Sequence, residues 1–152
     1  MFRGIHMINI DAKGRCAIPT CYRENLSEHA ERQLVVTIDT ESPCLLLYPL
    51  PEWEVIERKL EALPSFNAQA RRIQRLLIGH AQEVELDSSG RILLPPPLRE
   101  FASLDKKVAL VGQGKKFEIW SETCWYESRR EWLENQPLSE SILPDDVKTL
   151  SL

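Results

Sequence analysis

The sequence contains few residues that could build a metal centre or a disulfide framework. Its 152 residues include four cysteines, none of which forms a Cys-x-x-Cys pair. Its three histidines fall at no metal-ligand spacing relative to those cysteines. This pattern favours free thiols in a reducing compartment and predicts no cofactor. Bound zinc stays open as the weaker alternative.

Long hydrophobic runs are also missing. No stretch reaches the roughly 18 consecutive apolar residues that a membrane-spanning helix needs, and no secretory signal peptide opens the chain. We therefore expect a cytoplasmic protein with no membrane partner. The length suits one domain or two small ones.

Signatures of catalysis are absent as well. The sequence shows neither a phosphate-binding glycine loop nor a grouping of serine, histidine and aspartate that would activate a nucleophile. No residue is therefore predicted to be catalytic, and these absences argue against an enzyme.

Positive charge is in deficit overall, but not locally. The chain has 19 lysines and arginines against 23 aspartates and glutamates, a net charge of −4 that by itself argues against a nucleic-acid partner. Residues 1–23, however, contain four basic side chains and one acidic one, and residues 64–80 contain three arginines and no acid. Attraction to phosphate depends on local charge density, so a basic N-terminal segment on an acidic body is compatible with binding nucleic acid.

What the sequence does contain is a short pattern that occurs twice. Residues 10–19 and residues 86–95 both read apolar-Asp-x-x-Gly-Arg-x-x-apolar-Pro. An offset of 76 residues relates five identical pairs, namely Asp11 and Asp87, Gly14 and Gly90, Arg15 and Arg91, Pro19 and Pro95, and Arg23 and Arg99. Five identities in one register indicate an internal duplication.

The repeated pattern predicts a β-hairpin with a tight turn. An aspartate at this position accepts hydrogen bonds from backbone N–H groups further along the turn, and the glycine takes a positive φ. The residues expected to fix the two turns are Asp11, Gly14, Asp87 and Gly90. The arginine after each glycine lies near the hairpin tip. It either pairs with its own aspartate or serves a function that both copies share.

Each copy continues with a short helix, two strands and a longer helix. We expect helices over residues 20–29, 51–63, 66–78, 98–104 and 121–133, with Ser65 and Ser121 as N-caps of the third and the last. The expected units are a first repeat with its trailing helix (1–63), a connecting helix (64–80), a second repeat with its trailing helix (81–136) and an acidic C-terminal tail (137–152).

The paired hairpins and the order of elements after them resemble the MraZ family of transcriptional regulators. That family carries two AbrB-like DNA-binding units in one chain, and the resemblance extends from residue 1 to about residue 135. It implies an α+β fold, an internally duplicated swapped-hairpin AbrB-like β-barrel with flanking helices. It also implies a ring-like homo-oligomer. Two apolar-striped helices and four tryptophans independently favour self-association.

The resemblance implies a sequence-specific regulator of transcription that binds double-stranded DNA. Arg15 and Arg91 would contact bases, because arginine pairs with guanine O6 and N7 in the major groove. The side chains expected to contact phosphates are Lys13, Arg3, Arg23 and Arg99. The expected targets are short G-rich direct repeats upstream of the protein's own gene. The protein would act in the nucleoid as a repressor of its operon and of cell-division and cell-wall genes.

The alternative is a protein-interaction module of the AbrB type, such as an antitoxin. Antitoxins that share this fold type usually have one copy of the unit and a disordered toxin-binding tail. The duplication and the helices in both halves favour the DNA-binding regulator instead. Retention on heparin or duplex DNA at low salt separates the two functions.

Overall fold

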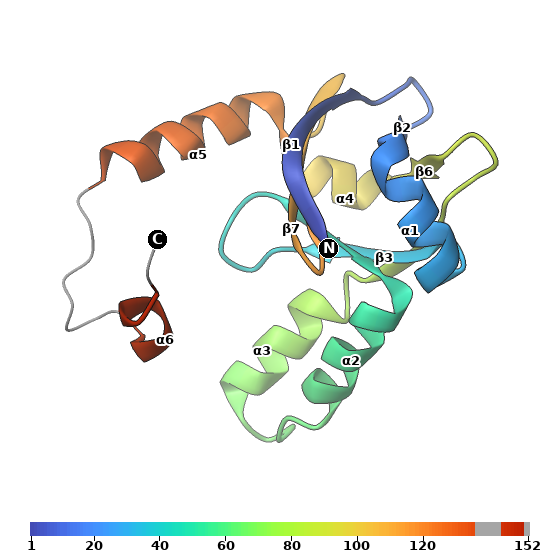
Figure 1. Cartoon of the computed structure of the whole chain (residues 1–152). Coiled ribbons are helices and arrows are strands. Elements are labelled where there is room, and N and C mark those ends of the chain that lie inside the picture. Colours follow the sequence, from blue (N-terminus) through green and yellow to red (C-terminus); the bar gives the residue numbers. More distant parts are fainter. Residues whose placement is uncertain (136–143, 151–152) are drawn as a thin grey trace.

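The computed structural model of the chain describes residues 1–135 and 144–150 (Figure 1). Its strands are β1 (Phe2–Asn9), β2 (Arg15–Ala17), β3 (Gln33–Ile38), β4 (Leu45–Pro49), β5 (Gln82–Glu85), β6 (Arg91–Leu93), β7 (Lys107–Gly114) and β8 (Phe117–Ser121). Its helices are α1 (Thr20–Ala30), α2 (Leu50–Glu61), α3 (Ala68–Leu77), α4 (Pro96–Phe101), α5 (Glu122–Glu134) and α6 (Asp145–Lys148). No helix in this described part is long and apolar enough to cross a membrane. Of the tail predicted over 137–152, residues 137–143, 151 and 152 lie outside the described residues.

Local sequence signals explain where the helices begin. Ser121 caps α5 as predicted, with its hydroxyl accepting a hydrogen bond of 3.1 Å from the backbone N–H of Cys124. The N-cap of α3 is Asn67, whose side chain accepts from two backbone N–H groups of the first turn. The prediction of Ser65 as this cap was therefore wrong, and α3 begins two residues later than expected. Prolines in the first turn begin α2 and α4, where no hydrogen bond is lost.

The strands of the two repeats are interleaved. Six strands form one antiparallel sheet in the order β1-β7-β8-β4-β3-β5, and β2 pairs with β6 in a separate two-stranded ribbon. The pairing crosses between the repeats, because β1 lies against β7, β5 against β3, and β2 against β6. The α+β class is confirmed. Among the described residues the large sheet stays open, so the closed barrel is not confirmed.

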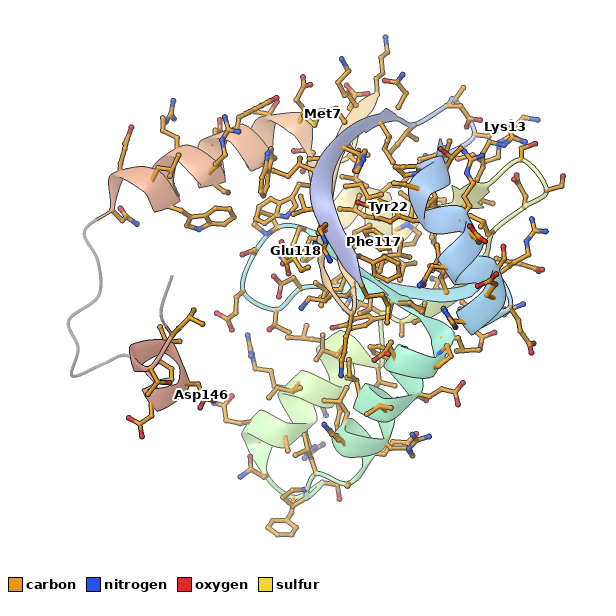
Figure 2. All side chains as sticks on the ribbon, in the orientation of Figure 1. Met7, Lys13, Tyr22, Phe117, Glu118 and Asp146 are labelled. Atoms are coloured by element: carbon orange, nitrogen blue, oxygen red, sulfur yellow. The ribbon has the colours of Figure 1, made fainter. Side chains whose placement is uncertain are left out.

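The main core lies between the sheet, the β2–β6 ribbon and helices α1 and α4. Phe117 of β8 is fully buried there. Its ring centroid lies 4.2 Å from that of Phe2 and 5.0 Å from that of Tyr22, and Figure 2 shows Tyr22 and Phe117 side by side in the interior. Aromatic contacts thus join the first strand and first helix of repeat one to the last strand of repeat two.

Two separate helical layers cover the opposite face of the sheet. Helices α2 and α3 pack over Val35, Leu46 and Tyr48, and α5 packs over a second cluster that contains Trp120 and Trp125. In Figure 1 the α2–α3 pair and α5 extend in different directions, and neither covers the side on which the turns after β1 and β5 project. Both turns are therefore accessible.

Candidate nucleic-acid interface

The first turn is closed by hydrogen bonds around Asp11. The backbone N–H of Asp11 donates to the carbonyl of Arg15 over 2.9 Å, and the N–H of Gly14 donates to the carbonyl of Asp11 over 3.0 Å. Carboxylate Oδ1 of Asp11 accepts from the backbone N–H groups of Lys13 and Arg15, both at 2.9 Å. Gly14 has a φ of +91°, a conformation that side-chain-bearing residues rarely adopt. One carboxylate and one glycine thus define the turn.

The second turn repeats this geometry. The N–H of Asp87 donates to the Arg91 carbonyl over 2.8 Å, and the N–H of Gly90 donates to the Asp87 carbonyl over 3.0 Å. Oδ1 of Asp87 accepts from the N–H groups of Ser89 at 2.8 Å and Arg91 at 2.9 Å. Gly90 has a φ of +75°. The sequence identity between the copies therefore reflects one local structure built twice.

Each tip arginine forms an ion pair with the aspartate of its own turn. Arg15 Nε lies 2.9 Å from Asp11 Oδ2, and Arg91 Nε lies 3.2 Å from Asp87 Oδ2. The simpler alternative from the sequence, pairing across the turn, is thus present in both copies. In the described part of the chain the side-chain hydrogen bonds of both arginines use Nε and leave Nη1 and Nη2 without a partner. The pairing is compatible with a second contact through those two nitrogens.

The β2–β6 ribbon places both arginines on one surface. Arg15 lies opposite Leu93 and Ala17 lies opposite Arg91, while the pair between them is buried. Side chains alternate along a strand, so the four named residues share the outward face. Arg15 and Arg91 are diagonal neighbours there, with Cα atoms roughly 7–8 Å apart.

Two other predicted phosphate-binding residues lie in different surroundings. Lys13 is exposed in the first turn, and Figure 2 shows it at the outer edge of the molecule on the side away from α5. Arg3 pairs with Gln113 near the start of β1. At about 3.3 Å per residue, the eight residues from Arg3 to Asp11 span up to roughly 26 Å. The structure therefore places Arg3 at the end of β1 that lies away from the first turn.

Arg23 and Arg99 each contact the turn of the other repeat. Arg23 Nε donates to the carbonyl of Ile18 over 2.6 Å, and Arg99 Nε donates to that of Leu94 over 3.0 Å, so each is anchored in its own repeat. Their guanidinium groups, however, lie against the turn glycine of the other repeat. Distance along the sequence would assign each arginine to its own hairpin, and it cannot reveal such a crossing.

Arg32 is a contributor that was not predicted from the sequence. It has a φ of +66° and lies two residues after the end of α1. Its Nε donates to the carbonyl of Leu86 over 3.0 Å, and its Nη2 donates to the carbonyl of Asp87. The residue 76 positions later is Val108, so the duplication gave no signal for this contact. Arg32 adds a positive charge beside the second turn.

One group of three potential metal ligands occurs in the described residues, away from both turns. Asp39, Cys44 and Glu118 have ligand atoms within 4.8 Å of one another. The Cys44 thiol donates to Asp39 over 3.6 Å, and Glu118 accepts from the indole N–H of Trp120 over 2.9 Å. Burial raises the pKa of the Cys44 thiol. These groups are partnered by protein atoms, and we assign no metal to them.

Replacing Asp11 with asparagine should lower DNA affinity only mildly. Asparagine keeps an oxygen for the N–H groups of Lys13 and Arg15, but it loses the ion pair with the Arg15 side chain. Fluorescence anisotropy with a labelled duplex measures the affinity, and circular dichroism checks the fold. Asp11→Ala, which removes the oxygen as well, is the matched control and should be worse. Complete loss of binding by a folded Asp11→Asn protein would show that the carboxylate does more than shape the turn.

Acid should loosen both turns. The pKa of Asp11 lies below its ordinary value of 3.8 because the backbone N–H of Arg15 donates to the carboxylate, and the N–H of Arg91 lowers the pKa of Asp87 likewise. A lowered folded-state pKa stabilises the fold above the unfolded-state pKa, and this contribution is lost as the pH falls through the folded-state value. NMR titration of the carboxyl carbons should therefore give midpoints below 3.8. A midpoint at or above that value would contradict the hydrogen-bonded turn.

The comparisons with known proteins cover the full chain. The family model described as "MraZ protein, putative antitoxin-like" matches residues 1–76 and again residues 77–141. Proteins named transcriptional regulator MraZ match over 152 residues, with 100% of both chains covered. They are 58% identical in Coxiella burnetii (strain RSA 493 / Nine Mile phase I), 55% in Legionella pneumophila (strain Paris) and 54% in Alkalilimnicola ehrlichii (strain ATCC BAA-1101 / DSM 17681 / MLHE-1). The two family matches divide the chain between its two hairpin units, and this chain belongs to the MraZ family.

Proposed function

We propose that this protein is a transcriptional regulator that binds double-stranded DNA in a sequence-specific manner. The observation that carries the proposal is the β2–β6 ribbon, whose outward face bears both tip arginines. Its relatives are named as regulators of transcription and not as enzymes, which agrees with the absence of catalytic signatures from the sequence. The proposed location is the cytoplasm, in association with the nucleoid.

The shape of the ribbon suits the major groove of DNA. A two-stranded ribbon fits that groove, and an arginine there can donate two hydrogen bonds to guanine O6 and N7. In both turns the aspartate contacts Nε, so Nη1 and Nη2 can donate to a base. The ion pairs also fix the orientation of each guanidinium before DNA arrives, which lowers the cost of ordering it on binding. Arg15 and Arg91 are the proposed base-contacting residues.

The remaining basic residues would contact phosphates. Lys13 lies in the first turn, and Arg23 and Arg99 lie beside the turns of the opposite repeats. Arg3 would reach phosphates only where the DNA passes the far end of β1. The turn-fixing residues Asp11, Gly14, Asp87 and Gly90 would carry no direct contact. We propose that the interleaved strands are the core of a swapped-hairpin AbrB-like unit, with the repeats and linker bounded as predicted from the sequence.

The proposed targets are short G-rich direct repeats upstream of the protein's own gene, and the proposed effect is repression of that operon and of cell-division and cell-wall genes. Two arginines on one ribbon favour boxes that contain guanine. A footprint on that upstream DNA would locate the boxes.

Binding to duplex DNA tests the proposal directly. A labelled duplex with two G-rich boxes is titrated between about 50 and 200 mM salt, beside a duplex of the same composition in shuffled order. The proposal predicts a clear preference for the boxes and a steep fall of affinity with salt. Equal affinity for both duplexes would refute base recognition. Failure to bind DNA or heparin at low salt would instead favour the antitoxin-like alternative that the family description suggests.

We expect the protein to form a closed, ring-like homo-oligomer. Several large apolar side chains are exposed in the single chain away from the ribbon, namely Ile5, Phe66, Trp132 and Leu133. Association would place several ribbons on one DNA molecule, so that weak contacts combine through their effective concentration. Light scattering at micromolar concentration should show a mass several times 17.5 kDa. A monomer under these conditions would remove the avidity argument.

A further inference from the structure

We propose that Arg23 and Arg99 are crossed positioning residues, each of which orients the tip arginine of the other repeat. On this view Arg99 positions Arg15, and Arg23 positions Arg91. The inference rests on the proposed DNA-binding function, but the contacts that carry it are internal to the protein. It gives these two arginines a role beyond the phosphate contacts that their charge suggests.

The first step is that each arginine is fixed at its base. Arg23 lies in α1 and Arg99 in α4, each four residues after the proline that ends its hairpin. The Nε atoms donate to the carbonyls of Ile18 and Leu94, over 2.6 and 3.0 Å. Each is half-buried. A side chain held in this way presents one flat face of its guanidinium in a defined direction.

The second step is that this flat face lies directly on a turn glycine of the other repeat. A Cβ added to Gly14 would come 2.6 Å from Arg99 Cζ and 2.8 Å from Arg99 Nε. A Cβ added to Gly90 would come 2.7 Å from Arg23 Cδ and would also overlap Nε and Cζ of that side chain. Glycine is thus favoured at both positions for two reasons. The backbone has a positive φ, and the arginine side chain occupies the space that a Cβ would need.

The third step is that the backbone crosses at the same two places. The N–H of Ile18 donates to the carbonyl of Gly90 over 2.9 Å, and the N–H of Leu94 donates to the carbonyl of Gly14 over 3.0 Å. Each turn is therefore stabilised by hydrogen bonds to its own aspartate. The carbonyl of its glycine accepts a further hydrogen bond from the other repeat. The residue that follows each glycine is the tip arginine.

Arginine is required at these positions for its shape as well as its charge. Lysine keeps a positive charge that can attract phosphate, but it has no planar group to cover a glycine and no Nε–H to donate sideways. A phosphate contact should therefore survive Arg99→Lys in large part, whereas positioning should not. This difference separates the two roles.

The test combines Arg99→Lys with its mirror image, Arg23→Lys, in the full-length protein. TROSY spectra of glycine-labelled protein, recorded without DNA, should show that Arg99→Lys shifts the Gly14 amide and leaves Gly90 in place, with the reverse for Arg23→Lys. Arg72→Lys, on the exposed face of α3, is the control and should move neither. Shifts of the glycine in the same repeat, or of neither glycine, would overturn the crossed contact whatever the protein binds.

DNA binding then tests positioning. Arg99→Lys should lower the preference for the G-rich duplex over the shuffled one by roughly tenfold or more, the scale of a lost hydrogen bond to a charged group, while the salt slope stays unchanged. In a double variant with Arg15→Ala, Arg99→Lys should lower this preference little further. In a double variant with Arg91→Ala, the losses of the two single changes should add in full. Wild-type preference in Arg99→Lys would overturn the positioning role. If the wild-type protein itself binds no DNA, the proposed function fails, and the spectra still decide the crossed contact.

Discussion

Replacing Gly14 with alanine should lower the free energy of unfolding by about 2–5 kcal/mol and weaken specific DNA binding. Alanine at φ +91° has a left-handed backbone conformation that costs roughly 1–2 kcal/mol. Its Cβ would also lie 2.6 Å from Arg99 Cζ, so the guanidinium would have to move and give up its hydrogen bond to the Leu94 carbonyl, which costs roughly a further 1–3 kcal/mol. Denaturant unfolding measures the first effect, and titration of a G-rich duplex measures the second.

Gly114 provides the matched control for this prediction. Its φ is +80°, and nothing lies within 4 Å of the place where a Cβ would be, so Gly114→Ala should show the backbone cost alone. Adding Arg99→Ala to Gly14→Ala should relieve the overlap, so the double variant should lose clearly less stability than the sum of the two single changes. Equal losses at Gly14 and Gly114, or strict additivity of the pair, would contradict the close approach of Arg99.

The turns and most of the helices could be predicted from the sequence because their causes are local. Asp11 and Gly14 set the first turn through contacts within four residues, and the same holds for Asp87 and Gly90. The cap of α5 follows from one serine. The error at α3 has a local cause as well. Both Ser65 and Asn67 are good N-caps, and only Asn67 makes the capping hydrogen bonds.

The crossing of the repeats could not be predicted in the same way. Which strand β1 pairs with depends on contacts across more than 90 residues of sequence, and the alternation of apolar residues is the same for any partner. The contacts of Arg23, Arg99 and Arg32 depend on the crossing of the two repeats. Each of these arginines contacts a turn that lies far away in the sequence. Charge counts along the sequence therefore identified the basic residues but not their places.

Arg15→Ala should weaken specific binding more than Arg91→Ala, and neither change should unfold the protein. Local geometry cannot produce this ranking, because the two arginines are 32% and 36% exposed and their ion pairs are 2.9 and 3.2 Å long. The difference comes from the surrounding charge. Lys13 lies in the first turn where the second has Ser89, and Glu83 and Glu85 precede the second turn.

Arg99 lies beside the first turn and Arg23 beside the second. Each turn therefore has one such arginine, and the crossing does not change the ranking of Arg15 above Arg91. Arg32 beside the second turn offsets only one of the two glutamates of β5, the strand that leads into that turn. Carboxylates close to a tip weaken its attraction for DNA, so the first turn should be the main base-contacting site. Removing an arginine that reads a base costs roughly 1–3 kcal/mol per site and relaxes specificity. In an oligomer that places several ribbons on one DNA molecule, this cost is repeated at every subunit.

Titrating both variants against one labelled duplex over a range of salt concentrations decides the ranking. If Arg15 contacts a base, Arg15→Ala should reduce discrimination between the G-rich and shuffled duplexes and change the salt slope little. If it instead neutralises a phosphate, its removal should flatten the log–log slope by roughly one unit. Lys13→Ala is the control for that second behaviour, because Lys13 is exposed in the same turn. Equal effects of the two arginine variants, or a larger effect of Arg91→Ala, would show that the local field does not decide which turn dominates.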